Sequence, residues 1–278
     1  MHSDYHIHTE FSDDSEYPME NAVLDAIRLG LEEICFTDHV DYGVKAEFGA
    51  NTTRTYKGKA VTNVDYPRYF DTIKVLQAKY EEKISIRSGL EFGVQLHTRD
   101  AFLKLIADYP LDFIILSIHQ INDLELWTQS FQKGKTQAEY NLAYFQALLD
   151  VVKNYKAYSV LGHMDLVVRY DEQGVYPFIE VKALITEILK IVIADGKGIE
   201  VNTSYIRYGL DDMTPSRDIL RLYRELGGEI ITIGSDTHHA DHLGTYINIA
   251  KKELLTLGFT HHYTFEDMKP IAHTIQLK

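Results

Sequence analysis

Residues 4–14 of the chain read DYHIHTEFSDD, and this stretch decides how the rest of the sequence is interpreted. Tyr5 and Ile7 alternate with His6 and His8, which is the two-residue period of a β-strand. Both imidazoles therefore leave one face of that strand, where they can bind the same metal ion. Because an exposed strand with two solvated histidines has the same pattern, a metal site requires further ligands from later strands.

The composition is that of an ordinary globular chain. Its 278 residues are 45% hydrophobic and 25% charged, which suffices for one large α/β domain or two small ones. We find no linker, low-complexity tract or repeat that would divide it. We therefore expect a single catalytic domain over residues 1–278.

Several classes of protein are disfavoured. No apolar run approaches the roughly 20 residues of a membrane-spanning helix, and no signal peptide is recognisable. A formal charge of −13 lacks the basic character of a nucleic-acid-binding surface. The single cysteine, Cys35, suits a reducing compartment. We expect a cytoplasmic protein with neither a membrane nor a nucleic acid as partner.

Short apolar segments alternate with amphipathic helices along the chain. Apolar spacing predicts helices at residues 19–29, 66–82, 135–153, 178–194 and 215–226. Between them, strands are expected around His6 and at residues 33–39, 84–92, 113–118, 158–163, 199–203 and 230–238. This order implies a parallel sheet, and seven units fit a closed or nearly closed barrel better than an open sheet. Active sites of such barrels lie at the C-terminal ends of the strands.

Ionisable residues gather at those strand ends. Any one of them could be a hydrogen-bonded core histidine or a solvated carboxylate. Packed together at the mouth of a barrel, they would be costly without cations, so the set predicts a metal cluster. The set comprises His6, His8, His39, Glu91, His119, His163, Asp236 and His238.

Six short segments together resemble the motifs of the polymerase and histidinol phosphatase (PHP) superfamily. They are DYHIHT (4–9), FTDH (36–39), GLE (89–91), SIH (117–119), GHMD (162–165) and GSDTH (234–238). The resemblance implies a distorted (β/α)7 barrel, similar to a TIM barrel, with two to three divalent metal ions. Zinc is the first expectation, and manganese or iron are the alternatives.

The resemblance also implies how the ligands are shared. The first metal ion would take His6, His8, Glu91 and Asp236, and the second would share Glu91 and add His119 and His163. His39 and His238 would bind the third. Asp14 stands where many relatives have a histidine, and a carboxylate there makes manganese or iron more suitable.

Within the superfamily, the segments GHMDLVVR (162–169) and NTSYIR (202–207) resemble the stand-alone histidinol-phosphate phosphatases. That resemblance implies a small-molecule phosphate monoester as substrate, namely L-histidinol phosphate, hydrolysed to L-histidinol and phosphate in histidine biosynthesis. Arg169 and Arg207 would contact the phosphoryl oxygens, because a guanidinium matches phosphate geometry. Alternatively, each arginine pairs with a surface carboxylate such as Asp171 or Asp211.

The leaving alkoxide needs a proton, for which Glu10, His239 or a bound water is available. The long segment 41–65 is either a lid over the mouth or a solvated insertion. With Glu10, its aromatic and acidic residues, Tyr42 among them, would bind the ammonium and imidazole of the substrate.

Other functions remain open on the sequence. One is a different PHP phosphoesterase, such as a tyrosine phosphatase or a phosphodiesterase. An amidohydrolase also begins with His-x-His, but the segment SIHQ (117–120) lacks the lysine that often bridges its metals. A non-catalytic metal-binding regulator is the third alternative.

Overall fold

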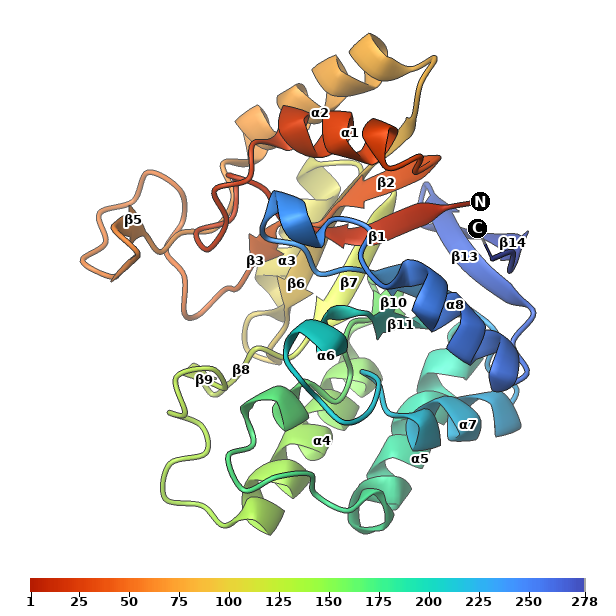
Figure 1. Ribbon diagram of the computed structural model, residues 1–278. Coiled ribbons are helices and arrows are strands. Elements are labelled where there is room, and N and C mark those ends of the chain that lie inside the picture. The colour runs from red at the N-terminus through yellow and green to blue at the C-terminus, as the bar shows by residue number, and fades with distance from the viewer. Residues whose placement is uncertain (278) are drawn as a thin grey trace.

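Seven parallel strands form a nearly closed barrel in the computed structural model, which describes residues 1–277 (Figure 1). Their spatial order follows the chain: β1 (Ser3–Ile7), β2 (Glu33–Phe36), β6 (Ser85–Gly93), β7 (Phe113–Ser117), β10 (Val160–Leu161), β11 (Gly198–Asn202) and β12 (Ile231–Gly234). The first and last strands meet where His8 donates its backbone N–H to the Thr237 carbonyl at 2.8 Å. The expected barrel is thereby confirmed.

The five predicted helices are present with ends that differ by no more than a few residues: α1 (Met19–Arg28), α2 (Tyr66–Tyr80), α4 (Gln137–Asn154), α5 (Phe178–Ala194) and α7 (Arg217–Glu225). Their starts have recognisable chemistry. The Asp65 side chain caps α2, and Thr136 with Glu139 forms a capping box at α4. Figure 1 shows α1 and α2 over one side of the barrel, and α4, α5 and α7 over the opposite side.

Several elements were not predicted. Apart from α3, they are short or lie beyond the last expected strand. The helical ones are α3 (Arg99–Asp108), η1 (Leu166–Tyr170), α6 (Ser204–Arg207), η2 (Ala240–His242) and α8 (Ile247–Thr256). The strands are β3 (His39–Val40), β4 (Thr55–Tyr56), β5 (Lys59–Ala60), β8 (Gln120–Ile121), β9 (Leu124–Glu125), β13 (His261–Glu266) and β14 (Lys269–Thr274). The segment 41–65 carries the β4–β5 hairpin, which projects from the barrel (Figure 1).

The N-terminal end of the barrel is filled by an apolar cluster, which we call the base. It consists of Tyr5, Cys35, Phe113, Ile115, Val160 and Phe265. Phe265 comes from the β13–β14 hairpin, so this hairpin covers the N-terminal end of the barrel. The pairing of β1 with β2 shifts register between Asp4 and Ile7, and Tyr5 and Ile7 accordingly belong to different clusters. The strict alternation expected for this strand is therefore interrupted.

No helix within residues 1–277 is long and apolar enough to cross a membrane.

Candidate metal centre and active site

Glu91, near the end of β6, is the central residue of the mouth of the barrel. Its side chain is fully buried. One oxygen, Oε1, lies 3.1 Å from His119 Nε2 and 2.8 Å from His163 Nε2. The other, Oε2, lies 3.3 Å from His6 Nε2, 3.5 Å from His8 Nε2 and 2.9 Å from His39 Nδ1. A carboxylate between two groups of imidazoles is suited to bridge two cations.

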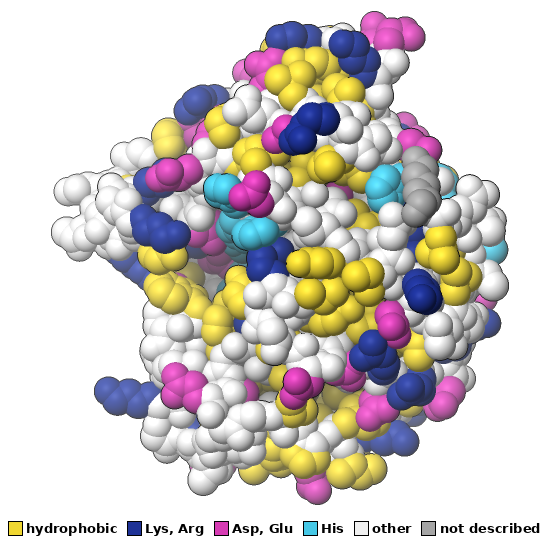
Figure 2. All heavy atoms as spheres, in the orientation of Figure 1, with side chains coloured by type: hydrophobic (Ala, Val, Ile, Leu, Met, Phe, Trp, Pro, Cys, Tyr) yellow, Lys and Arg dark blue, Asp and Glu magenta, His cyan; other side chains and the backbone are white. Residues whose placement is uncertain are grey.

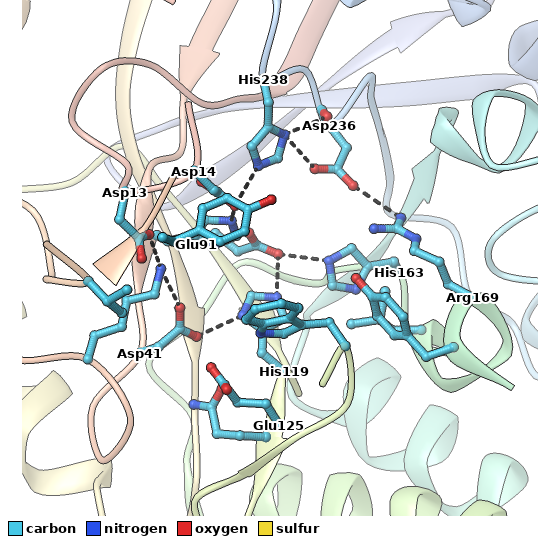
Figure 3. Close-up of a pocket in the computed structure, with 18 of the residues that line it drawn as sticks. Asp13, Asp14, Asp41, Glu91, His119, Glu125, His163, Arg169, Asp236 and His238 are labelled. Atoms are coloured by element: carbon cyan, nitrogen blue, oxygen red, sulfur yellow. Dashed lines mark hydrogen bonds and ion pairs between the residues drawn. The ribbon is translucent and has the colours of Figure 1, made fainter. Parts of the chain in front are cut away.

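Asp236 and Asp14 extend this arrangement. Asp236 Oδ1 is 3.7 Å from His6 Nε2 and 3.5 Å from His8 Nε2. Asp14 Oδ2 lies between the Nε2 atoms of His39, at 3.4 Å, and His238, at 3.2 Å. The structure therefore brings all nine sequence-predicted ligands together at one end of the barrel. Figure 3 shows six of them: Asp14, Glu91, His119, His163, Asp236 and His238.

The donor set fits metal ions. Buried atoms without a hydrogen-bond partner include Nε2 of His6, Nε2 of His8, Nδ1 of His39, Oε2 of Glu91 and Oδ1 of Asp14. Such atoms are costly unless something binds them. Four groups of ligand atoms converge closely enough to hold an ion: His6–Glu91–His163, His6–His8–Asp236, His8–His39–His238 and His39–Asp41–His119. These groups overlap with the ligand sets expected from the sequence, although Asp41 was not among them.

The protonation of these groups follows from their surroundings. Burial, His238 and His39 all lower the pKa of His8 well below its usual value, so His8 keeps its lone pair. Burial opposes ionisation of Glu91, but His119 and His6 outweigh it and hold its pKa well below the usual range. Burial opposes protonation of His6 and His119, but the carboxylates beside them outweigh it and raise the pKa of both rings. A metal ion that binds these two rings must therefore displace their protons, because neutral imidazoles and ionised carboxylates are the forms that bind metal ions.

Two buried carboxylates orient the predicted ligands from behind. Glu200 Oε1, on β11, is 2.5 Å from His6 Nδ1, while Oε2 accepts the backbone N–H of His163 at 2.9 Å. Gly234 allows this contact, since a Cβ there would lie 2.3 Å from His6 Cβ. Asp41 Oδ1 holds His119 Nδ1 at 2.7 Å in the same manner. Carboxylate–histidine contacts of this kind fix the ring orientation in metal sites.

Lys45 supplies a positive charge beside the cluster. Its Nζ lies 2.7 Å from Asp13 Oδ1 and 3.1 Å from Asp41 Oδ2, and its side chain is 9% exposed. Burial disfavours its charge, but Asp41 and Asp13 outweigh that effect and raise its pKa. Lys45 therefore carries a positive charge at neutral pH.

The two predicted phosphate-binding arginines differ in position. Arg169, on η1, lines the pocket, donates to Asp236 Oδ2 at 3.1 Å, and stacks 4.2 Å from the centre of the Tyr208 ring. Arg207, on α6, donates instead to the backbone carbonyls of Ser235 and Asp236 and does not line the pocket. It supports Asp236, whose φ of +54° is an uncommon left-handed conformation. Neither arginine pairs with Asp171 or Asp211.

Three other predicted residues lie outside the pocket. Glu10 is exposed and accepts the backbone N–H of Met19 at 2.5 Å, at the start of α1. The His239 side chain is 67% exposed and caps η2. The hydroxyl of Tyr42 is 3.1 Å from that of Tyr66, and its ring packs on Phe102. Glu10 and His239 thus cap helices, and Tyr42 packs against other rings, whereas we had expected all three near the substrate.

A pocket of about 320 Å³ opens above the cluster, and Figure 2 shows histidines gathered beside this hollow. Its lining includes Arg169, Tyr170 and Tyr208. It also includes an aromatic and acidic wall, which consists of Tyr56 from the β4–β5 hairpin, Trp127 and Glu125. The rings of Tyr56 and Trp127 meet edge to face at 5.8 Å, and Arg54 forms an ion pair with Glu125.

Comparison with known proteins agrees with this geometry. The model of the PHP domain family matches residues 4–204. The chain belongs to the PHP family. A histidinol-phosphatase of Lactococcus lactis is 35% identical over 275 residues, which cover 96% of this chain and 95% of that protein. A probable histidinol-phosphatase of Thermotoga maritima is 26% identical and covers 99% of both chains.

A solved structure extends the comparison from sequence to fold. The crystal structure of the Lactococcus lactis histidinol phosphate phosphatase, complexed with zinc, L-histidinol and phosphate, matches with a TM-score of 0.83. The match has 35% identity and covers 97% of this chain and 98% of that one. The putative histidinol phosphatase of Listeria monocytogenes, at 21% identity and a TM-score of 0.71, shares the fold.

Sequence reasoning within the PHP family missed several pocket residues. Lys45, Arg54 and Trp127 lie on loops, and Glu125 ends the two-residue strand β9; the sequence does not specify the course of these segments. Glu200 could have been recognised from the sequence, because Glu200 and Asn202 alternate with Ile199 and Val201 in a buried strand. A carboxylate within such a strand needs a polar partner, and the barrel interior is where the metal ligands are.

Proposed function

We propose that this chain is a metal-dependent phosphomonoesterase that hydrolyses L-histidinol phosphate to L-histidinol and phosphate. It would act as a single catalytic domain over residues 1–278, in the cytoplasm. The observation that carries the proposal is the Glu91 cluster with Arg169 at its edge, because this combination suits a phosphoryl group. The Lactococcus lactis relative, whose structure holds zinc, L-histidinol and phosphate, supports the choice of substrate.

The metal ions would be held by His6, His8, Asp14, His39, Glu91, His119, His163, Asp236 and His238. When bound, they supply positive charge next to the phosphoryl oxygens and activate the attacking water. Zinc is the expected metal, given the zinc in the relative. Manganese and iron are alternatives, since Asp14 is a harder ligand than the histidine it replaces.

The residues of the chain divide the remaining work. Arg169 neutralises an equatorial phosphoryl oxygen, and its bond to Asp236 fixes the orientation of the guanidinium. Arg207 acts through the backbone of Ser235 and Asp236, which it holds in place. Glu200 and Asp41 keep the rings of His6 and His119 in a fixed orientation.

The aromatic and acidic wall is the natural place for the leaving group. With the phosphoryl group beside Arg169, the rest of the substrate extends toward Tyr56, Trp127 and Glu125. Aromatic rings suit an imidazole, and a carboxylate suits an ammonium. Tyr56, Trp127 and Glu125 thus have the role that we expected of Glu10 and Tyr42.

The decisive experiment compares phosphate release from L-histidinol phosphate and from p-nitrophenyl phosphate, using protein loaded with zinc or with manganese. We expect far greater efficiency on L-histidinol phosphate. Glu125→Gln should raise KM for L-histidinol phosphate and leave KM for the aryl ester unchanged. Equal efficiency on both esters would remove the substrate assignment and keep the phosphatase chemistry, whereas inactivity on both would remove the chemistry as well.

A further inference from the structure

Lys45 joins two carboxylates that come from different parts of the chain. Its Nζ lies 2.7 Å from Oδ1 of Asp13, in the loop between β1 and α1, and 3.1 Å from Oδ2 of Asp41, which follows β3. The Asp13 and Asp41 side chains are only 7% and 4% exposed. Figure 3 shows both aspartates beside the predicted metal ligands. Because a buried carboxylate is costly without a partner, both of them depend on this one ammonium group.

The two oxygens of Asp41 have different partners. Oδ1 holds Nδ1 of His119 at 2.7 Å, and the other ring nitrogen, Nε2, lies 3.1 Å from Oε1 of Glu91. Oδ2 faces Lys45. The carboxylate also packs closely against Gly93, where a Cβ atom would clash with Oδ1. Asp41 is therefore held between the ring that it orients and the ammonium group of Lys45.

Asp41 is also able to bind a metal ion itself. Together with His39 and His119 it forms one of the four groups whose ligand atoms converge. Carboxylates suit manganese and imidazoles suit zinc, so a free Asp41 carboxylate would complete a further cation site. An ion in that site would compete for His119 with the metal ion next to Glu91.

The ammonium group of Lys45 opposes this binding in two ways. It pairs with Oδ2 of Asp41, so the carboxylate is no longer a free ligand. Its positive charge also repels a cation at short range, and the repulsion is strong because the surroundings are buried.

We propose that Lys45 is a positioning residue, which keeps Asp41 available for His119 and excludes a further cation from the group His39–Asp41–His119. Lys45 thereby limits the number of metal ions that the mouth of the barrel holds. It acts through Asp41 and not through contact with the substrate. The proposal concerns metal binding alone, so it stands or falls separately from the substrate proposed above.

Lys45→Met keeps much of the length of the side chain and removes its charge. The full chain is dialysed against excess Mn²⁺, and its manganese content is measured by elemental analysis beside the wild type. The variant should hold about one more Mn²⁺ per chain, because the freed carboxylate suits manganese. Lys45→Gln, which still donates a hydrogen bond, replaces this variant if it does not fold. An unchanged manganese content would overturn the proposal, and a lower content would show that Lys45 supports metal binding instead.

A double variant assigns the extra ion to Asp41. When Asp41→Asn is added to Lys45→Met, the manganese content should return to that of the Asp41→Asn single variant. An extra ion that persists would be bound by Asp13, and the proposed role of Asp41 would be wrong.

A small amine separates the charge of Lys45 from its packing. Lys45→Ala leaves space beside Asp13 and Asp41, and ethylammonium is small enough to enter it. Ethylammonium chloride should lower the manganese content of this variant to the wild-type value, whereas sodium chloride at the same ionic strength should not. Equal contents in the two salts would mean that the positive charge does not exclude the further ion, which would also overturn the proposal.

Discussion

The two ends of the barrel satisfy their buried polar groups in opposite ways. At the base, the Tyr5 hydroxyl donates to Glu33 Oε1 at 2.5 Å and accepts the Phe265 backbone N–H at 2.9 Å, while Arg87 donates to Glu33 Oε2. At the mouth, Glu91 Oε2 and the Nε2 atoms of His6 and His8 lack a hydrogen-bond partner. These polar groups of the base are satisfied within the protein, whereas those of the mouth need bound cations.

This difference separates stability from chemistry along one axis of the molecule. Rings at the base pack directly, with Tyr5 and Phe113 at 5.0 Å and Phe113 and Phe265 at 5.1 Å. At the mouth, carboxylates and imidazoles are held close together, with their ligand atoms converging for metal binding. Substitutions at the mouth should therefore change metal content and turnover, whereas substitutions at the base should change the free energy of unfolding.

The largest effect is expected for Glu91→Gln. Loss of the central carboxylate should lower metal content and reduce turnover by more than about 1,000-fold, or about 4 kcal/mol. Elemental analysis and phosphate release measure the two quantities. Far-ultraviolet circular dichroism should stay that of the wild type, because the base is unchanged. A variant with full metal content and full turnover would contradict the central role of Glu91.

Phe265→Ala tests the other end. Removing the ring from the base should lower the free energy of unfolding by about 3 kcal/mol, which is typical of a buried phenylalanine that leaves a cavity. Denaturant titration of the metal-free protein measures this. Turnover per folded molecule should match the wild type, because no atom of the mouth is changed. A large loss of turnover in the folded variant would break the proposed separation of the two ends.

Arg169→Ala compares two arginines at the same mouth. The variant should lose roughly 100-fold in turnover, or about 2.7 kcal/mol, with unchanged metal content. Arg207→Ala should lose less, since Arg207 bonds only to backbone carbonyls. Steady-state kinetics and elemental analysis of both variants decide between these roles. Equal losses would mean that Arg207 also reaches the phosphoryl group.

Glu200→Gln tests whether Glu200 orients the predicted metal ligands His6 and His163. The amide still fits between His6 and the backbone of His163, but it no longer carries the charge that orients the imidazole. Metal affinity should fall roughly 10- to 100-fold, as for other residues that hold a ligand in place. Competition with a chelator measures the affinity directly, and Glu200→Asp is the matched variant that keeps the charge. Unchanged affinity in Glu200→Gln would limit Glu200 to a packing role.

The metal ligands at the mouth could be predicted from the sequence better than the residues around them. Strand ends in a parallel barrel converge by geometry, so His6, Glu91, His163 and Asp236 could be placed together from their positions in the strands. Glu10 also follows a strand, yet its carboxylate caps α1. Local hydrogen bonds of this kind compete with a functional role and are not visible in a motif.

The base and the loops were largely beyond prediction. The β13–β14 hairpin has six paired positions, but its docking on Tyr5 joins residues about 260 positions apart. The aromatic and acidic wall of the pocket likewise depends on a contact between Arg54 and Glu125, which are 71 positions apart. Such contacts depend on where loops of variable course come to lie, and a single sequence carries no periodic signal for them.

The smallest effect is a pH dependence of the free energy of unfolding, which arises from His262 on β13, the strand that also carries Phe265. Burial, Lys251 and His273 lower the pKa of His262 to about 3, whereas an unfolded histidine titrates near pH 6.5. The folded state thus excludes a proton that the unfolded state binds, and stability is lost as pH falls from about 6.5 toward 3. His262→Gln can keep a donor to the Met1 carbonyl without titrating. Between pH 7 and pH 5, the wild type should lose about 1–2 kcal/mol more than this variant in denaturant titrations of metal-free protein. Parallel pH profiles for the two proteins would contradict this prediction and would show that water reaches His262 in the folded state.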